Sequence, residues 1–300
     1  MTTLLRTPLL RSTTLGEAFG GTALLKAELF QKTGSFKPRG ILAKLASLSP
    51  QQKERGVITV SAGNAAAAVA YGCAIEGLDC LVVMWQGTSE LKAAACRGYG
   101  AAVDVEAPNP VEAFTRVEEL RESSGRVFVH PYDDPLVIEG HASLGREIIE
   151  DAPETEVIVA QAGGGGLVSG LALGAPGVRV VAVEPQTSAA LHEGLAAGHP
   201  VTIRPESIAD ALNAPQAGEH TLRVCAERGV ESVLVTEDDI RAGFGFLYER
   251  AKLAAEPGAA AGVGALLAGK VPDVEGRNVV AVVSGGNVAP EIAAAILKGE

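Results

Sequence analysis

Short apolar runs with the composition of β-strands alternate with helix-like segments through most of this chain. The clearest runs span residues 56–60, 80–84, 157–160, 178–183 and 279–283, and several are apolar at nearly every position. Such runs are typical of strands that are buried on both faces of a sheet. Their alternation with helical segments predicts an α/β fold, in which twisted, mostly parallel sheets with right-handed crossovers are flanked by helices.

Other elements are expected around this framework. A strand over residues 22–28 is predicted to lead into a lysine-containing turn, and the spacing of apolar residues predicts a helix over 40–48. Residues 141–151 are expected to form a helix that crosses between two lobes. Residues 9–19 are interpreted as a short linker and turn.

Charge and cysteine content narrow the class of protein. Hydrophobic residues make up 47% of the chain and charged residues 20%, as in a soluble globular enzyme, and the net charge of −11 argues against nucleic acid or an anionic membrane as a partner. The 4 cysteines form no CxxC pair and have no metal-ligand spacing, so we interpret them as reduced packing residues. The N-terminus lacks the apolar core of a signal peptide, and no run of about 18 apolar residues occurs. These features predict a cytoplasmic protein with a small-molecule partner.

Four loops are expected to meet at one edge of the sheets. The lysine loop (residues 33–40, Thr-Gly-Ser-Phe-Lys-Pro-Arg-Gly) follows the predicted strand at 22–28. The asparagine loop (61–64), the tetraglycine loop (163–166) and the serine loop (284–287) each follow the carboxyl end of another predicted strand. In open α/β sheets, ligands bind in the crevice at these strand ends. The four loops are therefore predicted to form one binding site.

Two of these loops have two interpretations each. Lys37 is either a solvated residue after a turn or a buried amine that forms a Schiff base, which requires a site that lowers its pKa and orients it. The tetraglycine loop is either a flexible turn needed for close packing or a ring of backbone N–H groups that binds a phosphate at a helix N-terminus. The chain has neither a GxGxxG fingerprint with its acidic partner nor a GxxxxGK[ST] motif, which disfavours a nicotinamide or ATP site.

Asn64 and Ser284 also leave alternatives open. Asn64 is either the N-cap of the helix that follows it or an amide donor to a phenolic oxygen on a cofactor ring. If Asn64 binds a cofactor ring, the N–H groups of residues 62–65 are expected to bind a substrate carboxylate. Ser284 either ends its strand or places a neutral hydroxyl beside a pyridine nitrogen.

The order and spacing of Lys37, Asn64, the four glycines and Ser284 resemble those of the fold-type II pyridoxal-phosphate enzymes, in particular the threonine/serine dehydratase (ammonia-lyase) and serine racemase family. The resemblance covers nearly the whole chain and includes Lys-Thr-Gly-Ser-Phe-Lys at 32–37 and His-Pro-Tyr-Asp-Asp-Pro at 130–135. It implies a two-domain fold like that of tryptophan synthase β and a homodimer. The implied large cofactor-binding domain comprises residues 1–52 plus 142–300, and the implied small mobile domain comprises residues 53–141.

The resemblance also implies a role for each loop. Lys37 would be the catalytic residue, which carries pyridoxal 5'-phosphate as a Schiff base and removes the Cα proton of the substrate. Phe36 would pack beside the cofactor ring, Asn64 would bond its hydroxyl and Ser284 would meet its nitrogen. The phosphate would be bound by Gly163, Gly164, Gly165, Gly166 and Leu167. The substrate would be bound by Ser61, Ala62, Gly63, Asn64, Ala65 and His141.

The implied reaction is β-elimination from a β-hydroxy amino acid, L-threonine or L-serine, to give a 2-oxo acid and ammonia. An amino-acid racemase, a β-replacement synthase and a non-catalytic ligand-binding protein are the alternatives. Serine racemases carry a second serine at the position of Ala62, so alanine here favours elimination. The divalent-cation site of the family begins at Glu184, but the aspartate expected six positions later is Ala190. Because hard cations need several oxygen ligands, no metal is predicted.

Overall fold

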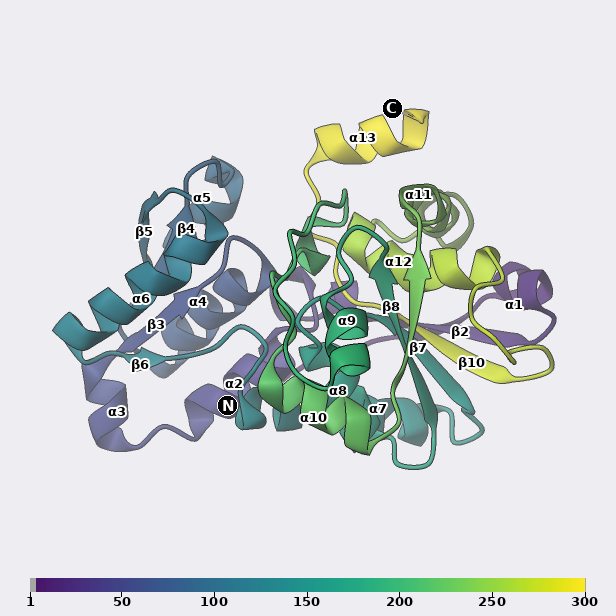
Figure 1. Cartoon of the computed structure of the whole chain (residues 1–300), viewed down its shortest axis with the longest axis horizontal. Coiled ribbons are helices and arrows are strands. Elements are labelled where there is room, and N and C mark those ends of the chain that lie inside the picture. Colours follow the sequence, from purple (N-terminus) through teal and green to yellow (C-terminus); the bar gives the residue numbers. More distant parts are fainter. Residues whose placement is uncertain (1–3, 300) are drawn as a thin grey trace.

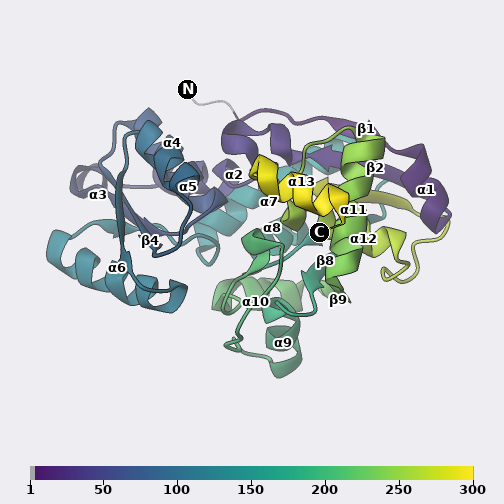
Figure 2. The ribbon, with the colours of Figure 1, turned by 90° about the horizontal axis from the view of Figure 1, so that it is seen from above.

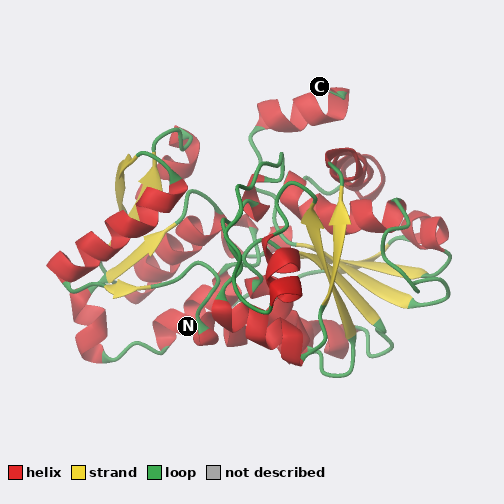
Figure 3. Ribbon diagram, viewed as in Figure 1, coloured by secondary structure: helices red, strands yellow, loops and turns green. Residues whose placement is uncertain are grey.

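The computed structural model describes residues 4–299 of the chain, and its strands form two sheets (Figures 1 and 3). The larger sheet has six strands in the order β1-β2-β10-β7-β8-β9. These are β1 (Leu9–Arg11), β2 (Thr22–Ala27), β7 (Val157–Gln161), β8 (Arg179–Pro185), β9 (Glu231–Val235) and β10 (Asn278–Val283). Every neighbouring pair is parallel except β1 and β2, which are antiparallel.

The smaller sheet has four parallel strands in the order β5-β4-β3-β6 and lies to the left in Figure 1. Its strands are β3 (Val57–Val60), β4 (Cys80–Trp85), β5 (Ala102–Ala107) and β6 (Val127–Phe128). All four fall inside residues 53–141, the range expected for the small domain. The exact division into domains and the mobility of the smaller one stay predictions.

Helices flank both sheets, which confirms the α/β class. The α-helices are α1 (Thr13–Phe19), α2 (Pro38–Ala46), α3 (Pro50–Arg55), α4 (Asn64–Glu76), α5 (Glu90–Gly98), α6 (Pro110–Ser124), α7 (Pro135–Asp151), α8 (Gly166–Gly174), α9 (Ala190–Ala197), α10 (Glu219–Glu227), α11 (Glu237–Phe246), α12 (Pro257–Leu267) and α13 (Pro290–Lys298). Short 3-10 turns occur at η1 (Glu28–Phe30), η2 (Lys32–Gly34) and η3 (Asp210–Leu212), and α11 continues into a π-helical turn, η4 (Leu247–Ala251). No helix within residues 4–299 is long and apolar enough to cross a membrane.

The six-stranded sheet is buried on both faces, which explains its continuous apolar runs. Val157 and Val159 of β7 pack into the core beneath α1, α11 and α12. Ile158 and Ala160 of the same strand pack into the opposite core, which is formed with α7, α8 and α10. Figure 2 shows α11, α12 and α13 gathered on one side of this sheet.

The structure corrects two predictions at element boundaries. Residues 9–19 are not a linker, because they form β1 and α1. The Ser12 hydroxyl caps α1 by accepting a hydrogen bond from the Leu15 N–H, and Gly20 ends it in the left-handed region (φ 76°). The helix predicted for 141–151 begins at Pro135 instead. The Asp134 carboxylate caps that start, because it accepts hydrogen bonds from two N–H groups of the first turn.

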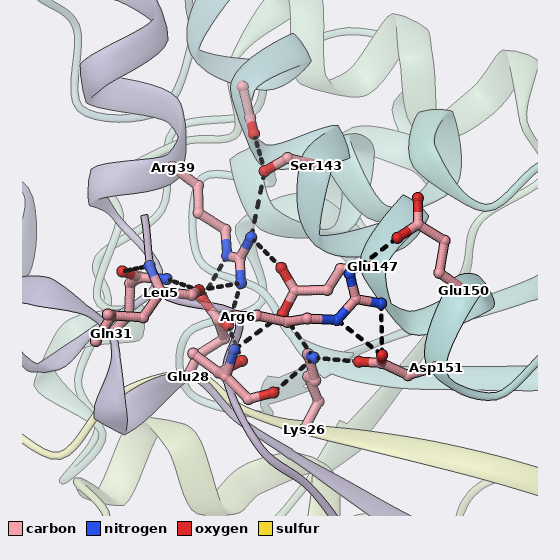
Figure 4. A network of polar contacts seen from close by, with 12 residues as sticks. Leu5, Arg6, Lys26, Glu28, Gln31, Arg39, Ser143, Glu147, Glu150 and Asp151 are labelled. Atoms are coloured by element: carbon pink, nitrogen blue, oxygen red, sulfur yellow. Dashed lines mark hydrogen bonds and ion pairs between the residues drawn. The ribbon is translucent and has the colours of Figure 1, made fainter. Parts of the chain in front are cut away.

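A buried polar network ties the start of α2 to β2 and α7 (Figure 4). The Arg39 guanidinium donates to Glu28 from Nε (2.7 Å) and to Glu147 from Nη1 (2.9 Å). The Lys26 amine lies 2.7 Å from Glu147 and 3.0 Å from Asp151. The side chains of Lys26, Glu28 and Arg39 are almost wholly buried, so each charge depends on its partner. The network therefore fixes the helix that begins immediately after Lys37.

Candidate active site

The lysine loop and the serine loop are hydrogen-bonded to one another. The Phe36 N–H donates to the Ser284 carbonyl (2.9 Å), and the Gly286 N–H donates to the Gly34 carbonyl (2.9 Å). Ser35 and Gly285 form an antiparallel bridge between these two bonds. The bonds join two segments from opposite ends of the chain because β2 and β10 are parallel neighbours in the sheet.

The Lys37 side chain is enclosed by protein groups. Its amine donates to the Pro131 carbonyl (2.9 Å) and lies 5.0 Å from the centre of the Phe36 ring. Burial lowers the pKa of Lys37 to about 8, against a smaller opposing effect of the Glu256 carboxylate, which raises it. Lys37 is therefore not a freely solvated lysine, and a large fraction of its amine is neutral in mildly alkaline solution.

The tetraglycine loop connects β7 to α8 and presents unpaired donors. Within residues 4–299, no acceptor is bonded to the N–H groups of Gly163, Gly164, Gly165, Gly166 or Leu167. The last two of these belong to the first turn of α8, where the helix dipole favours an anion. Gly165 has a φ of 92°, which favours glycine, and a Cβ atom on Gly164 would lie 2.3 Å from the Tyr132 ring. The loop is thus fixed by its packing, and its free donors suit a phosphate.

Asn64 is the first residue of α4 and not its cap, so the N-cap interpretation is wrong. Gly63 occupies the N-cap position, and no side chain of the described residues caps the helix there. The Asn64 amide instead donates to the two carboxylate oxygens of Glu256 (2.8 and 3.0 Å) and accepts from the Asn287 amide (2.8 Å). The Asn287 amide also donates to the Thr33 carbonyl (2.8 Å). Asn64 and Asn287 thus connect three of the four loops.

Glu256 is a site residue that the sequence did not reveal. It is 4% exposed, and burial raises its pKa to about 7, against the opposing hydrogen bond from Asn64. It precedes Pro257 at the start of α12, where an acidic residue is common for reasons of helix capping alone. Only the fold places it beside Asn64 and close enough to Lys37 for the charges to interact.

Ser284 follows Val283, the last residue of β10, and is 4% exposed. When the Gln161 amide is oriented so that its nitrogen donates to the Val282 carbonyl (3.1 Å), its oxygen accepts from the Ser284 N–H (3.2 Å) and from the Ser284 hydroxyl. Ser284 therefore presents a neutral hydroxyl whose partner is also neutral.

The residues predicted to bind substrate fall into two groups. In the asparagine loop, the Ser61 hydroxyl accepts from the Gly63 N–H (3.1 Å), while the N–H groups of Ala62, Asn64 and Ala65 have no acceptor in the described part of the chain. His141 lies elsewhere, on α7. It has no exposed surface, its ring is centred 4.8 Å from that of Phe36, and neither ring nitrogen has a partner among the described residues. Substrate contacts for both groups stay predictions.

Glu184, the first residue of the cation site implied by the resemblance, has a different role here. Its carboxylate accepts from the N–H groups of Leu191 (2.7 Å) and His192 (2.8 Å) in the first turn of α9, and from the Ser232 hydroxyl (3.2 Å). No cluster of three or more His, Cys, Asp or Glu side chains within residues 4–299 is arranged to bind a metal. The described cysteines are all unpaired and buried.

Fold and site together define a pyridoxal-phosphate dependent enzyme. The model of that family matches residues 2–285, so the chain belongs to it. The L-threonine ammonia-lyase of Thermotoga maritima is 38% identical over 288 residues, which cover 94% of this chain and 71% of the relative. The processed form of threonine deaminase isoform 2 from Solanum lycopersicum superimposes with a TM-score of 0.93 at 30% identity, covering 98% of this chain and 83% of that one. Maize serine racemase superimposes with a TM-score of 0.91 at 31% identity, covering 96% and 90%.

These comparisons confirm the predicted fold type and cofactor. The site also fits the cofactor on its own chemistry, because three kinds of group that can hold pyridoxal phosphate are present. A partly buried amine is supplied by Lys37, a row of N–H donors without a partner in the described chain by the tetraglycine loop, and a neutral hydroxyl by Ser284. The buried hydroxyls of Thr33 and Ser35, on either side of Gly34, have no partner in the described chain, as expected beside a polar ligand.

Proposed function

We propose that this protein removes water from L-threonine or L-serine and releases a 2-oxo acid and ammonia. The observation that carries the proposal is the position of the Lys37 amine. It is partly buried, has a lowered pKa and lies where the lysine and serine loops are hydrogen-bonded, in a chain that belongs to the pyridoxal-phosphate dependent family. Related proteins named for threonine ammonia-lyase and threonine deaminase activity support this substrate class.

The proposed roles of the residues follow from their chemistry. Lys37 would hold the cofactor covalently and, once released from it, would accept the Cα proton of the substrate on its neutral amine. The N–H groups of the tetraglycine loop and Leu167 would bind the phosphate, the Asn64 amide would bind the ring hydroxyl, and Ser284 would bind the ring nitrogen. Bound pyridoxal phosphate supplies the electron sink for the pair of electrons left at Cα.

The reaction balances without an external oxidant. Loss of the Cα proton and the β-hydroxyl releases one water and leaves an enamine. The enamine becomes an imine, which takes up one water and gives the 2-oxo acid and ammonia. The N–H groups of Ala62, Asn64 and Ala65 are proposed to bind the substrate carboxylate, because backbone donors near a helix N-terminus favour an anion.

Elimination is favoured over racemisation by the residue at position 62. Inversion at Cα needs an acid on the face of the substrate opposite Lys37, and Ala62 has no group that can carry a proton. The neighbouring Ser61 hydroxyl accepts a hydrogen bond from the Gly63 N–H (3.1 Å), so its oxygen lies against the backbone of its own loop. Racemisation and β-replacement remain measurable alternatives, since maize serine racemase shares the fold.

The test is release of 2-oxo acid by the purified protein loaded with pyridoxal phosphate. L-threonine, L-serine, hydroxyaspartate and phenylserine are compared, with a chiral assay for inverted substrate and an added thiol for replacement. We expect 2-oxo acid from threonine or serine, and at least about a thousandfold loss of rate in Lys37→Ala. If none of these amino acids yields a 2-oxo acid, the proposal is wrong. A homodimer in the cytoplasm is proposed from the family resemblance, and light scattering of the purified protein tests the dimer.

A further inference from the structure

The segment from His130 to Asp134, between β6 and α7, contacts both the lysine and the tetraglycine loop. We propose that Asp133 is a positioning residue, which holds the tetraglycine loop in the shape that binds the cofactor phosphate. This inference rests on the proposed phosphate site. Within residues 4–299, Asp133 makes no hydrogen bond to the tetraglycine loop. It acts through the first turn of α10, to which its carboxylate is bonded.

Asp133 caps α10 from a distant part of the chain. Its carboxylate accepts from the N–H groups of Glu219 (3.0 Å), His220 (2.9 Å) and Thr221 (3.2 Å). The residue at the N-cap position of α10 is Gly218, which has no side chain to do this. A Cβ atom on Gly218 would lie 2.1 Å from the Asp133 carboxyl carbon, so glycine here makes room for the carboxylate.

The capped turn of α10 is in turn hydrogen-bonded to the tetraglycine loop. The Thr221 hydroxyl donates to the Gly164 carbonyl (2.8 Å), and the Gly218 N–H donates to the same oxygen (3.2 Å). In a trans peptide, the carbonyl and the N–H of the next residue point in opposite directions. Holding the Gly164 carbonyl against α10 therefore turns the Gly165 N–H away from α10.

An external restraint of this kind is needed because glycine is permissive. Four successive glycines can adopt many backbone conformations, and ordering them costs more entropy than ordering other residues. Gly165 is at φ 92°, and a Cβ atom there would lie 2.9 Å from the Thr221 hydroxyl. The loop conformation is thus set by α10 on one side, and by the Tyr132 ring over Gly164 on the other.

The same short segment reaches the lysine. The Pro131 carbonyl accepts from the Lys37 amine (2.9 Å), and the Tyr132 hydroxyl donates to the Gln216 carbonyl (3.1 Å). Nδ1 of His130 accepts from the Asp133 N–H (2.8 Å), which orients the backbone of the segment. Burial lowers the pKa of His130 to about 4, so this nitrogen stays an acceptor near neutral pH. The segment therefore sets the lysine and the phosphate loop at a fixed separation.

The experiment compares equilibrium binding of pyridoxal phosphate with that of pyridoxal, which lacks the phosphate. Lysine attachment is common to both aldehydes, so the ratio of the two dissociation constants reports on the phosphate loop alone. We expect Asp133→Ala to raise the dissociation constant of pyridoxal phosphate about tenfold or more, the effect of losing one good hydrogen bond, and to leave that of pyridoxal within about twofold. Asp133→Asn, which keeps an acceptor, should recover part of the loss.

Asp134→Ala is the matched control. Asp134 is the adjacent aspartate, which caps α7 and pairs with Lys44 (2.6 Å), so its loss should leave the ratio unchanged. If Asp133→Ala does not fold, the same ratio is measured in Thr221→Val. That variant loses the hydrogen bond from the Thr221 hydroxyl to the Gly164 carbonyl and keeps the Asp133 cap on α10. The proposal is overturned if the variant that folds has the wild-type ratio of dissociation constants. An equal loss of affinity for both aldehydes is one such result. The proposed function is judged separately, by 2-oxo acid release from the wild type.

Discussion

Replacing Lys37 with methionine should make the cofactor-free protein more stable near neutral pH. The pKa of Lys37 falls from its ordinary value of 10.5 to about 8, because burial disfavours the charged amine. Below about pH 8 the lysine is charged in both the folded and unfolded states, so the folded state bears the full cost of the buried charge. The cost fades as the pH rises toward 10.5, where the amine is neutral in both states.

The size of the effect follows from the shift. A change from 10.5 to about 8 corresponds to roughly 3.4 kcal/mol at pH 7, since one pKa unit is about 1.36 kcal/mol. Methionine has a similar length and no charge, but it loses the hydrogen bond from the charged amine to the Pro131 carbonyl, worth about 1.5 kcal/mol. Lys37→Met should therefore raise the free energy of unfolding by about 2 kcal/mol at pH 7. Between pH 7 and pH 10, linkage lowers this stability difference by about 2.5 kcal/mol, so the variant should no longer be the more stable protein at pH 10.

Urea unfolding of the cofactor-free protein at pH 7 and pH 10 measures both quantities. Titrating groups that do not interact with the Lys37 charge are common to the two proteins, so their contributions cancel in the difference. Lys53→Met is the control, because Lys53 lies in a partly exposed pair with Glu76 and its loss should change the stability by less than about 1 kcal/mol at either pH. A methionine variant less stable than wild type at pH 7, or a difference that does not vary with pH, would refute the reasoning.

Three other substitutions test the surroundings of the lysine. Glu256→Gln removes the charge that raises the pKa of Lys37, so the pKa should fall further below 10.5, to less than about 8, as measured by the pH dependence of the rate of pyridoxal phosphate binding. Arg39→Met leaves the buried Glu28 carboxylate without its charged partner and should lower the free energy of unfolding, measured with urea, by about 3–5 kcal/mol. Gly164→Ala places a methyl group against the Tyr132 ring and should weaken pyridoxal phosphate binding about tenfold or more in a fluorescence titration.

Each of these has a matched control on the same protein. Glu291→Gln changes an exposed carboxylate on α13 and should leave the rate profile unaltered. Arg6→Met breaks the exposed end of the same polar network and should cost no more than about 1 kcal/mol. Gly98→Ala adds a methyl group where no other element of the described chain lies within 4 Å. A control that behaves like its test variant would show that the effect does not arise from the contact named.

The framework of the fold was predictable because burial on both faces leaves a strong sequence signal. The strand at 279–283 has valine or alanine at every position, and the structure places β10 at the centre of the six-stranded sheet. The edge strand β1 has no such run and pairs with one neighbour only, so residues 9–19 resembled a linker. The start of α7 was also missed, because its cap, Asp134, lies in a Pro- and Asp-rich stretch typical of turns.

The meeting of the lysine and serine loops was predictable in a similar way. Parallel strands bring their carboxyl ends to one edge, so residues after β2 and β10 had to be neighbours. The partners of those residues were not predictable. Glu256 reaches Asn64 from the start of a helix, and Asp133 reaches the first turn of α10 across 86 to 88 residues of chain, without any spacing rule that connects the pairs.

The hydrogen bonds of the site explain how an acidic protein can bind an anionic cofactor. A net charge of −11 repels a phosphate at long range, so attraction must come from groups close to the ligand. Two strong acceptors at the site are already paired: the Glu256 carboxylate with Asn64, and the Gly164 carbonyl with Thr221. The N–H donors of the tetraglycine loop have no acceptor within residues 4–299. A site whose carboxylate is occupied and whose backbone donors are free favours an anion over a cation of the same size, whatever the charge of the surface beyond it.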